Sequence, residues 1–92
     1  YIISRDIIFQ NRRYVMVSKA FILLEAQAGK TEEALHKVKQ IEGVKDVALV
    51  TGPYDLIIQL EAEDLKILGK IVSEKVQVIP GVTKTITCVV IG

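Results

Sequence analysis

The sequence predicts a single α+β domain with the element order β-α-β-β-α-β, in which an antiparallel four-stranded sheet carries both helices on one face. Three observations lead to this prediction. The chain has 92 residues, which suffice for one domain but not for two cores. Half of its residues are hydrophobic, which favours a packed core over disorder. Runs of strand-forming residues alternate with stretches of helical periodicity.

The first strand and the first helix are expected on either side of a turn at Gly29. Residues 16–26 are rich in Val, Ile, Leu and Phe, as strands are. Thr31 suits the N-cap of the helix, because its hydroxyl can accept a hydrogen bond from the first turn. Gly43 follows the helix, where a left-handed cap favours glycine. The inward stripe of this helix consists of Ala34, Leu35, Val38 and Ile41.

The second half of the chain begins with a hairpin. Strands are expected over residues 44–51 and 54–62, joined by a Gly-Pro turn at residues 52–53. A second helix follows the acidic pair at residues 63–64, and residues 82–91 form the last strand. The inner side of the second helix comprises Leu65, Leu68, Ile71, Val72 and Val76.

A weak internal repeat supports this order of elements. The segment that runs from the end of the first helix into the next strand matches, at a spacing of 38 residues, the corresponding segment after the second helix. The identical pairs are Lys37 with Lys75, Val38 with Val76, Ile41 with Ile79, Gly43 with Gly81, and Val44 with Val82. Two similar halves imply a fold with pseudo-twofold symmetry.

Alternation of side chains across each strand also assigns the two faces of the sheet. The face away from the helices should be polar in a monomer. Here it keeps several large apolar side chains, so we expect a sheet-to-sheet dimer interface. The residues expected at this interface are Phe21, Leu23, Leu49, Ile57 and Val89, with Val47 as the alternative to Leu49. In the competing interpretation, residues 1–14 fold back and cover this face.

Residues 1–14 differ from the rest, and we expect the domain itself to cover residues 15–92. Residues 2–3 and 7–9 are strand-like, which favours an extension or arm that docks on a neighbouring subunit. A disordered leader is the alternative. No apolar stretch approaches the roughly 20 residues of a membrane-spanning helix. The one cysteine, Cys88, fits a reducing, cytoplasmic setting.

Composition argues against several classes of function. The formal net charge is +1, so no basic face for nucleic acid is expected. His36 is the single histidine and lies off the inward stripe of its helix, which leaves no support for a zinc site or a catalytic triad. The Gly-Lys-Thr run at residues 29–31 lacks the upstream glycine of a phosphate loop. We therefore expect no enzyme, no metal and no other cofactor.

The strongest chemical constellation is the turn at residues 51–55, with the sequence Thr-Gly-Pro-Tyr-Asp. Main-chain N–H groups beside Gly52 could hold a carboxylate, and the Asp55 carboxylate could hold an ammonium group. A free amino acid carries both groups. An ordinary hairpin turn explains the same composition, because Gly, Pro and Asp are common turn residues. Thr85 and Thr87 add two hydroxyls, which the alternation places on the outer face of the last strand.

Three runs of sequence occur in a characteristic order and spacing. They are residues 50–56 (Val-Thr-Gly-Pro-Tyr-Asp-Leu), 62–65 (Ala-Glu-Asp-Leu) and 79–87 (Ile-Pro-Gly-Val-Thr-Lys-Thr-Ile-Thr). Together they resemble the effector-binding domain of the Lrp/AsnC family, the leucine-responsive and asparagine-linked transcription regulators. The same domain is called the RAM domain, for regulation of amino-acid metabolism. The similarity extends over residues 18–92.

This resemblance implies a ferredoxin-like fold of the dimeric α+β barrel type. Such a homodimer forms through the sheet and assembles further into tetramers, octamers or rings. The resemblance also implies a free amino acid as effector, bound in clefts between dimers. The residues that correspond to the ligand site of the family are Thr51, Gly52, Tyr54, Asp55, Thr85 and Thr87.

One departure from the family is large. Its regulators carry an N-terminal helix-turn-helix, and the strand-like residues 1–14 cannot hold three helices. The chain therefore resembles a stand-alone form or a fragment, for which we do not expect direct DNA binding. Three roles remain open. They are a homo-oligomeric amino-acid sensor linked to transcription regulation, an assembly partner of a DNA-binding paralogue with no ligand of its own, and a related regulatory domain of the ACT type.

Overall fold

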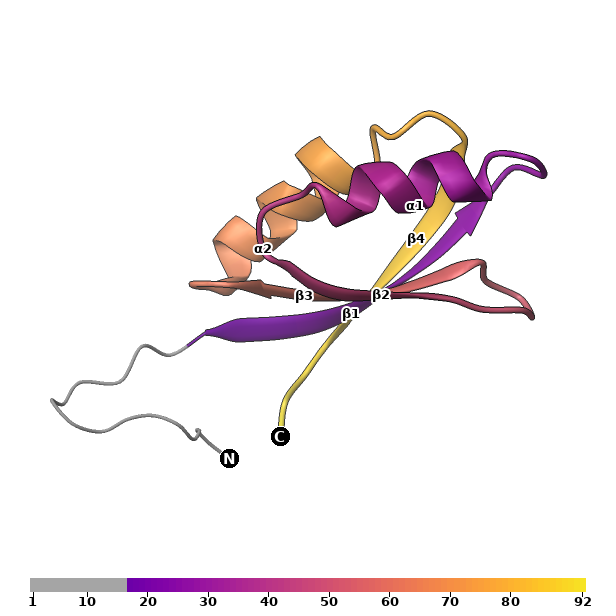
Figure 1. The fold of residues 1–92 in the computed structure, drawn as a ribbon. Coiled ribbons are helices and arrows are strands. Elements are labelled where there is room, and N and C mark those ends of the chain that lie inside the picture. Colours follow the sequence, from indigo (N-terminus) through magenta and orange to yellow (C-terminus); the bar gives the residue numbers. More distant parts are fainter. Residues whose placement is uncertain (1–16) are drawn as a thin grey trace, which may run out of the picture.

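The computed structural model describes residues 17–92, and its elements follow the predicted order (Figure 1). The predicted arm at residues 1–14 lies outside the described residues. The elements are β1 Ser18–Ala26, α1 Thr31–Lys39, β2 Val44–Leu49, β3 Leu56–Ala62, α2 Leu65–Ile71, the π-helical turn η2 Val72–Val76, and β4 Val82–Val89.

The four strands form one antiparallel sheet in the order β2-β3-β1-β4. Both helices pack on the same side of this sheet (Figure 1). We call the other side the outer face; Phe21 and Leu23 of β1 and Ile57 of β3 lie on it. The arrangement is the ferredoxin-like α+β fold that the sequence predicted.

The core lies between the sheet and the helices. It takes alternate residues of the two central strands, so the predicted alternation is confirmed in β1 and β3. Its side chains are Ala20, Ile22 and Leu24 of β1, Leu56, Ile58 and Leu60 of β3, Ala34 and Val38 of α1, and Leu68, Val72, Val76 and Ile79. Within residues 17–92 no polar or charged side chain is buried with them, so apolar burial stabilises this fold.

The two helices begin differently. Asp64 caps α2, because its Oδ1 accepts a hydrogen bond of 2.8 Å from the Ile67 N–H. Thr31, the predicted N-cap of α1, is instead the first helical residue. Lys30 takes the cap position without a side-chain hydrogen bond. The prediction is wrong here because Lys30 already has helical backbone angles and its N–H closes a turn onto the Gln27 carbonyl at 3.0 Å.

The second helix ends in the π-helical turn η2. The Gln77 N–H donates to the Val72 carbonyl at 2.8 Å, five residues back along the chain. Val72 and Val76 both stay in the core. Leu65, predicted on the inner side, is 55% exposed, because it starts α2 before the helix reaches the core at Leu68.

Gly43 and Gly81, which correspond in the internal repeat, close the two halves of the fold in the same way. Both have positive φ, at +100° and +93°. The Gly43 carbonyl accepts from the Glu61 N–H and the Gly81 carbonyl accepts from the Gln27 N–H, each at 2.8 Å. The symmetry inferred from the sequence is therefore present in the main-chain hydrogen bonds.

Candidate functional site

The candidate turn joins β2 to β3 at one end of the sheet (Figure 1). Its base is closed by the Val50 N–H, which donates to the Asp55 carbonyl at 2.9 Å. The Asp55 N–H donates to the Leu24 carbonyl of β1, also at 2.9 Å. The base of the turn is thus fixed to a central strand of the sheet.

The tip of the turn is open. Thr51, Gly52 and Pro53 are exposed, and Tyr54 is half-buried. Gly52 has φ +130°, and no atom lies within 4 Å of the place where a Cβ would stand. A small molecule can therefore approach the main chain at Gly52 without displacing a side chain. Recognition of an anion by main-chain N–H groups needs this kind of access.

Asp55 has a structural partner that the sequence did not reveal. Its Oδ2 accepts a hydrogen bond of 2.8 Å from the Ala26 N–H. This bond lies where the pairing of β1 with β4 shifts register, between Glu25 and Ala26, and where regular ladder bonding is interrupted. Asp55 therefore holds the end of β1 with one carboxylate oxygen.

We expect Asp55→Ala to lower the free energy of unfolding by about 1–2 kcal/mol, because the Ala26 N–H loses its acceptor. Asp55→Asn keeps an oxygen in the same place and removes the charge, so its loss should be smaller. Urea unfolding of the three proteins at equal concentration measures both changes. Equal losses in the two variants would show that the charge of Asp55, and not this hydrogen bond, stabilises the fold.

The register of β4 corrects the predicted position of the two threonines. Thr85 pairs with Leu24 and Thr87 pairs with Ile22. Both partners are core residues, so the threonines lie on the helix side of the sheet and not on the outer face. Thr85 Oγ1 accepts a hydrogen bond of 3.0 Å from Gln77 Nε2. No sequence signal singled out Gln77, which simply follows a helix.

The prediction fails in β4 because it places the apolar set of every strand against the core. β4 is an edge strand, so its helix side lies at the rim of the core, where hydroxyl groups keep access to water. Its apolar residues Ile86 and Cys88 pair with Leu23 and Phe21 instead. These apolar residues of β4 therefore belong to the outer face.

The turn and the threonines lie at the same end of the sheet but two strands apart. Leu49, Leu56, Leu24 and Thr85 form one row across the four strands. Because neighbouring strands are about 4.8 Å apart, the main chain at Thr85 is roughly 10 Å from that at Leu56. The fold brings together the four predicted ligand residues of the turn, and it leaves Thr85 and Thr87 at a distance from them within one protomer.

Two residues predicted on the outer face lie on the helix side. Leu49 pairs with Leu56 and Val89 pairs with Ala20, and both partners are core residues. The cause in β2 is a register shift between Val44 and Asp46, which changes the phase of the strand. The apolar residues of the outer face are Phe21, Leu23, Ala48, Ile57, Ile86 and Cys88.

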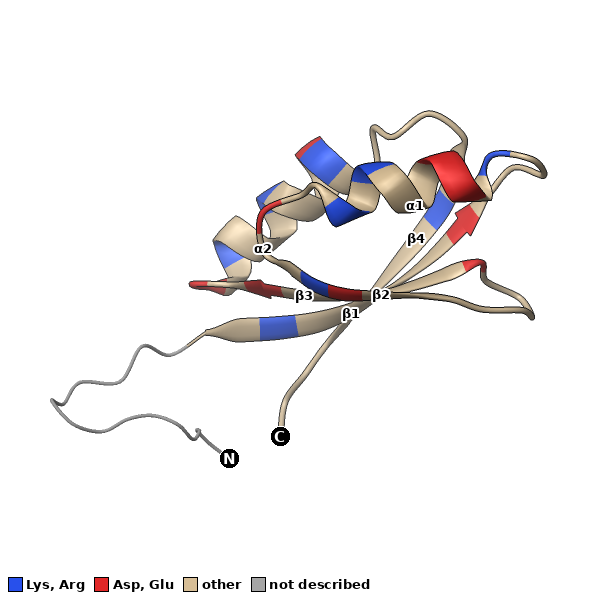
Figure 2. Ribbon diagram, in the orientation of Figure 1, with Lys and Arg blue, Asp and Glu red and all other residues tan. Residues whose placement is uncertain are grey.

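The corrected outer face still carries large apolar side chains, beside the polar Gln59 and Asp46 in the row of Phe21. Phe21 is 42% exposed at its centre. Along β1 no charged residue stands between Lys19 and Glu25 (Figure 2). Val47, the alternative to Leu49, pairs with a core residue of β3 and also faces the helices. The outer face therefore carries Phe21, Leu23 and Ile57 as predicted, with Ala48, Ile86 and Cys88 in place of the residues predicted in β2 and β4.

The described residues offer little support for other kinds of functional site. Among residues 17–92, no group of three or more His, Cys, Asp or Glu side chains is placed to hold a metal ion. His36 is exposed on α1. No helix of the same residues has the length and apolar character needed to cross a membrane.

A β2-β3-β1-β4 antiparallel sheet with both helices on one side defines the class of ferredoxin-like α+β domains. Within this class, residues 19–92 match the family described as the Lrp/AsnC ligand binding domain. The chain belongs to this family, as its three sequence motifs predicted.

Three relatives illustrate the match. A helix-turn-helix-type transcriptional regulator of Pyrococcus horikoshii is 37% identical over 73 residues, which are 76% of this chain and 49% of the regulator. The chain thus spans about half the length of the curated relatives it matches. The crystal structure of FFRP-DM1 is 38% identical with a TM-score of 0.77, over 83% of this chain and 100% of that one. A regulator from Neisseria meningitidis, solved as a complex with L-Met, shares the fold at 21% identity and a TM-score of 0.73, over 82% of this chain and 50% of its own.

Proposed function

We propose that the chain is an oligomeric effector-sensing module that binds a free amino acid and serves transcription regulation. The turn at residues 51–55 carries this proposal. Its base is fixed to β1 by the main chain and by the Asp55 carboxylate, while its tip exposes main chain around Gly52. A rigid, open main-chain site beside a carboxylate suits a small zwitterion, because N–H groups bind its carboxylate and Asp55 attracts its ammonium group.

We place the ligand between subunits. In one protomer the turn is two strands away from Thr85, and apart from its chain neighbours no residue of 17–92 lies within 4 Å of a Cβ placed at Gly52. A second subunit against this end of the sheet would supply the opposite wall, with Thr85 and Thr87 contributed by either chain. The outer face favours association of two protomers, because burial of its apolar area stabilises a dimer by about 25 cal/mol per Å².

The relatives support a regulatory role. The matched regulator of Pyrococcus horikoshii is of the helix-turn-helix type, and the Neisseria regulator with the same fold is a complex with L-Met. FFRP-DM1 is matched over its whole length. We therefore propose a cytoplasmic module of residues 15–92 that forms homodimers and larger rings and can assemble with a DNA-binding paralogue.

Thermal unfolding in the presence of each of the twenty amino acids tests the proposal. A ligand at 100 times its Kd should stabilise the folded state by about 2.7 kcal/mol. For a domain of this size that is a rise in Tm of roughly 10 °C or more. We expect at least one amino acid to produce such a rise at millimolar concentration.

Thr51→Val is the matched control for this measurement. The substitution removes a hydroxyl from an exposed position and keeps the shape of the side chain. Without ligand its Tm should equal that of the wild type, and with ligand its shift should be smaller. If no amino acid shifts the wild-type Tm while the oligomer is intact, the chain is an assembly partner without a ligand, and the sensing proposal fails.

A further inference from the structure

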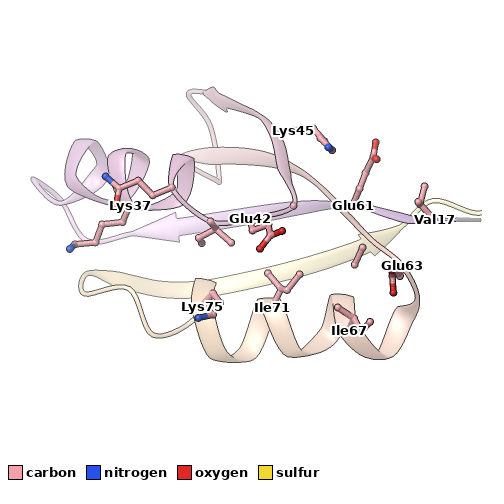
Figure 3. A pocket seen from close by; sticks show the side chains of 13 residues that line it. Val17, Lys37, Glu42, Lys45, Glu61, Glu63, Ile67, Ile71 and Lys75 are labelled. Carbon is pink, nitrogen blue, oxygen red and sulfur yellow. The ribbon is translucent and has the colours of Figure 1, made fainter. Parts of the chain in front are cut away.

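A groove of about 870 Å³ opens at the end of the sheet opposite the turn (Figure 3). It lies between the second helix and the ends of α1, β2 and β3. Ile67 and Ile71 of α2 line its wall, and Ile67 is 39% exposed. Lys45 and Glu61 also border the groove but point away from α2 (Figure 3). The fold thus leaves an apolar hollow open on its helix side.

Five exposed charged side chains line this groove, and four of them, all except Lys45, follow its length in a definite order. Lys37 and Lys75 stand at one end, Glu42 lies near the middle, and Glu63 stands at the other end (Figure 3). The two lysines come from the ends of the two helical segments, and the two glutamates follow α1 and β3. The end at Lys37 and Lys75 is therefore positive, and the other end is net negative because Glu42, Glu61 and Glu63 outnumber Lys45.

We propose that this groove is an isologous contact between two copies of the chain. A twofold axis through its middle reverses the direction of the groove, so that each positive half meets a negative half. Lys37 then faces the partner's Glu63, and Lys75 faces the partner's Glu42. The order of two positive charges followed by two negative charges makes the groove complementary to itself.

The lysine side chains of one copy can also fill the groove of the other copy. Lysine side chains can lay their methylene stems on apolar surface while the ammonium group stays at a carboxylate. The stems of the partner's Lys37 and Lys75 can therefore cover Ile67 and Ile71 within the groove. Exposed ion pairs each contribute about 0.2–1 kcal/mol, so the contact is weak and sensitive to salt.

This contact is compatible with the proposed sheet dimer but does not depend on it. The groove is on the helix side, whereas the sheet dimer uses the outer face (Figure 1). One protomer can therefore make both contacts at once. Because each contact joins copies in pairs, assemblies that use both have an even number of subunits.

Two double variants of the full chain test the proposal. Lys37→Glu with Lys75→Glu makes the groove acidic throughout, and Glu42→Lys with Glu63→Lys makes it basic throughout. Each variant alone brings like charges together, so light scattering at low salt and about 1 mM chain, where a contact of about 4 kcal/mol is populated, should give half the wild-type mass or less. An equimolar mixture of the two variants restores opposite charges, and its mass should return to that of the wild type.

Controls separate this contact from the sheet dimer. Lys39→Glu changes a charge on α1 that does not line the groove, so its mass should equal that of the wild type. Leu23→Asp on the outer face should remove the sheet dimer and leave pairs joined through the groove. A wild-type mass equal to that of both double variants, or a mixture that stays dissociated, would overturn the proposal whatever happens at the sheet.

Discussion

A protein with Leu23 replaced by Asp is expected to lose the proposed sheet-to-sheet dimer. Leu23 is central on the outer face, because it pairs with Ile57 on one side and with Ile86 on the other. In a dimer the new carboxylate would be buried without a counter-charge. Burial of an unpaired charge costs several kcal/mol of association free energy. A cost of about 4 kcal/mol corresponds to a roughly thousandfold weaker dimer. Light scattering over a dilution series measures this change.

Leu49→Asp is the control for this experiment. Leu49 is also a strand leucine and is 58% exposed, but it lies on the helix side in the row of Leu56. Its replacement should leave the dimer unchanged. The two variants therefore distinguish the observed register from the sequence-based prediction, which placed both leucines at the interface. Equal dissociation of both variants would mean that the outer face is not where the protomers meet.

Gly43→Ala is expected to cause a large loss of stability in this fold. Gly43 has φ +100°, and a Cβ at this position would lie 2.7 Å from the Glu61 carbonyl oxygen. That oxygen belongs to the main chain of β3, so strand and turn would have to move apart. We expect a loss of about 3 kcal/mol from backbone strain and displacement together.

Gly29→Ala isolates the backbone part of this loss. Gly29 also has positive φ, at +83°, but nothing lies within 4 Å of its potential Cβ. The loss should then be about 1 kcal/mol, the cost of a left-handed alanine. Urea unfolding of both variants at one protein concentration gives the difference. Similar losses would show that the close approach at Gly43 is relieved without cost.

The sequence predicted the fold well where each segment carries its own signal. Helical spacing located both helices, and alternation in β1 and β3 located the core, because these strands are central and one side of each is fully buried. The same rule fails in the edge strands. Val89 and Leu49 lie at the rim of the core, where an apolar side chain on either face is only partly buried, so hydrophobicity does not fix the phase of the strand.

The candidate site could be predicted in part. The turn was located because its residue types are unusual together and match a family motif. Its attachment was not predictable, because Asp55 bonds to Ala26, which lies 29 residues earlier in the sequence. The distance between the turn and Thr85 was hidden for a similar reason. It depends on the strand order, which places β1 between β3 and β4.

The bonds that fix the turn to β1 have a mechanical consequence. Asp55 is tied to Leu24 and Ala26 at one end of this strand, and the other end begins at Ser18. A strand of this length is a stiff rod of about 26 Å. A shift of the turn on binding of the proposed ligand would therefore act on β1 and, through it, on β4, which has no bond to the turn itself.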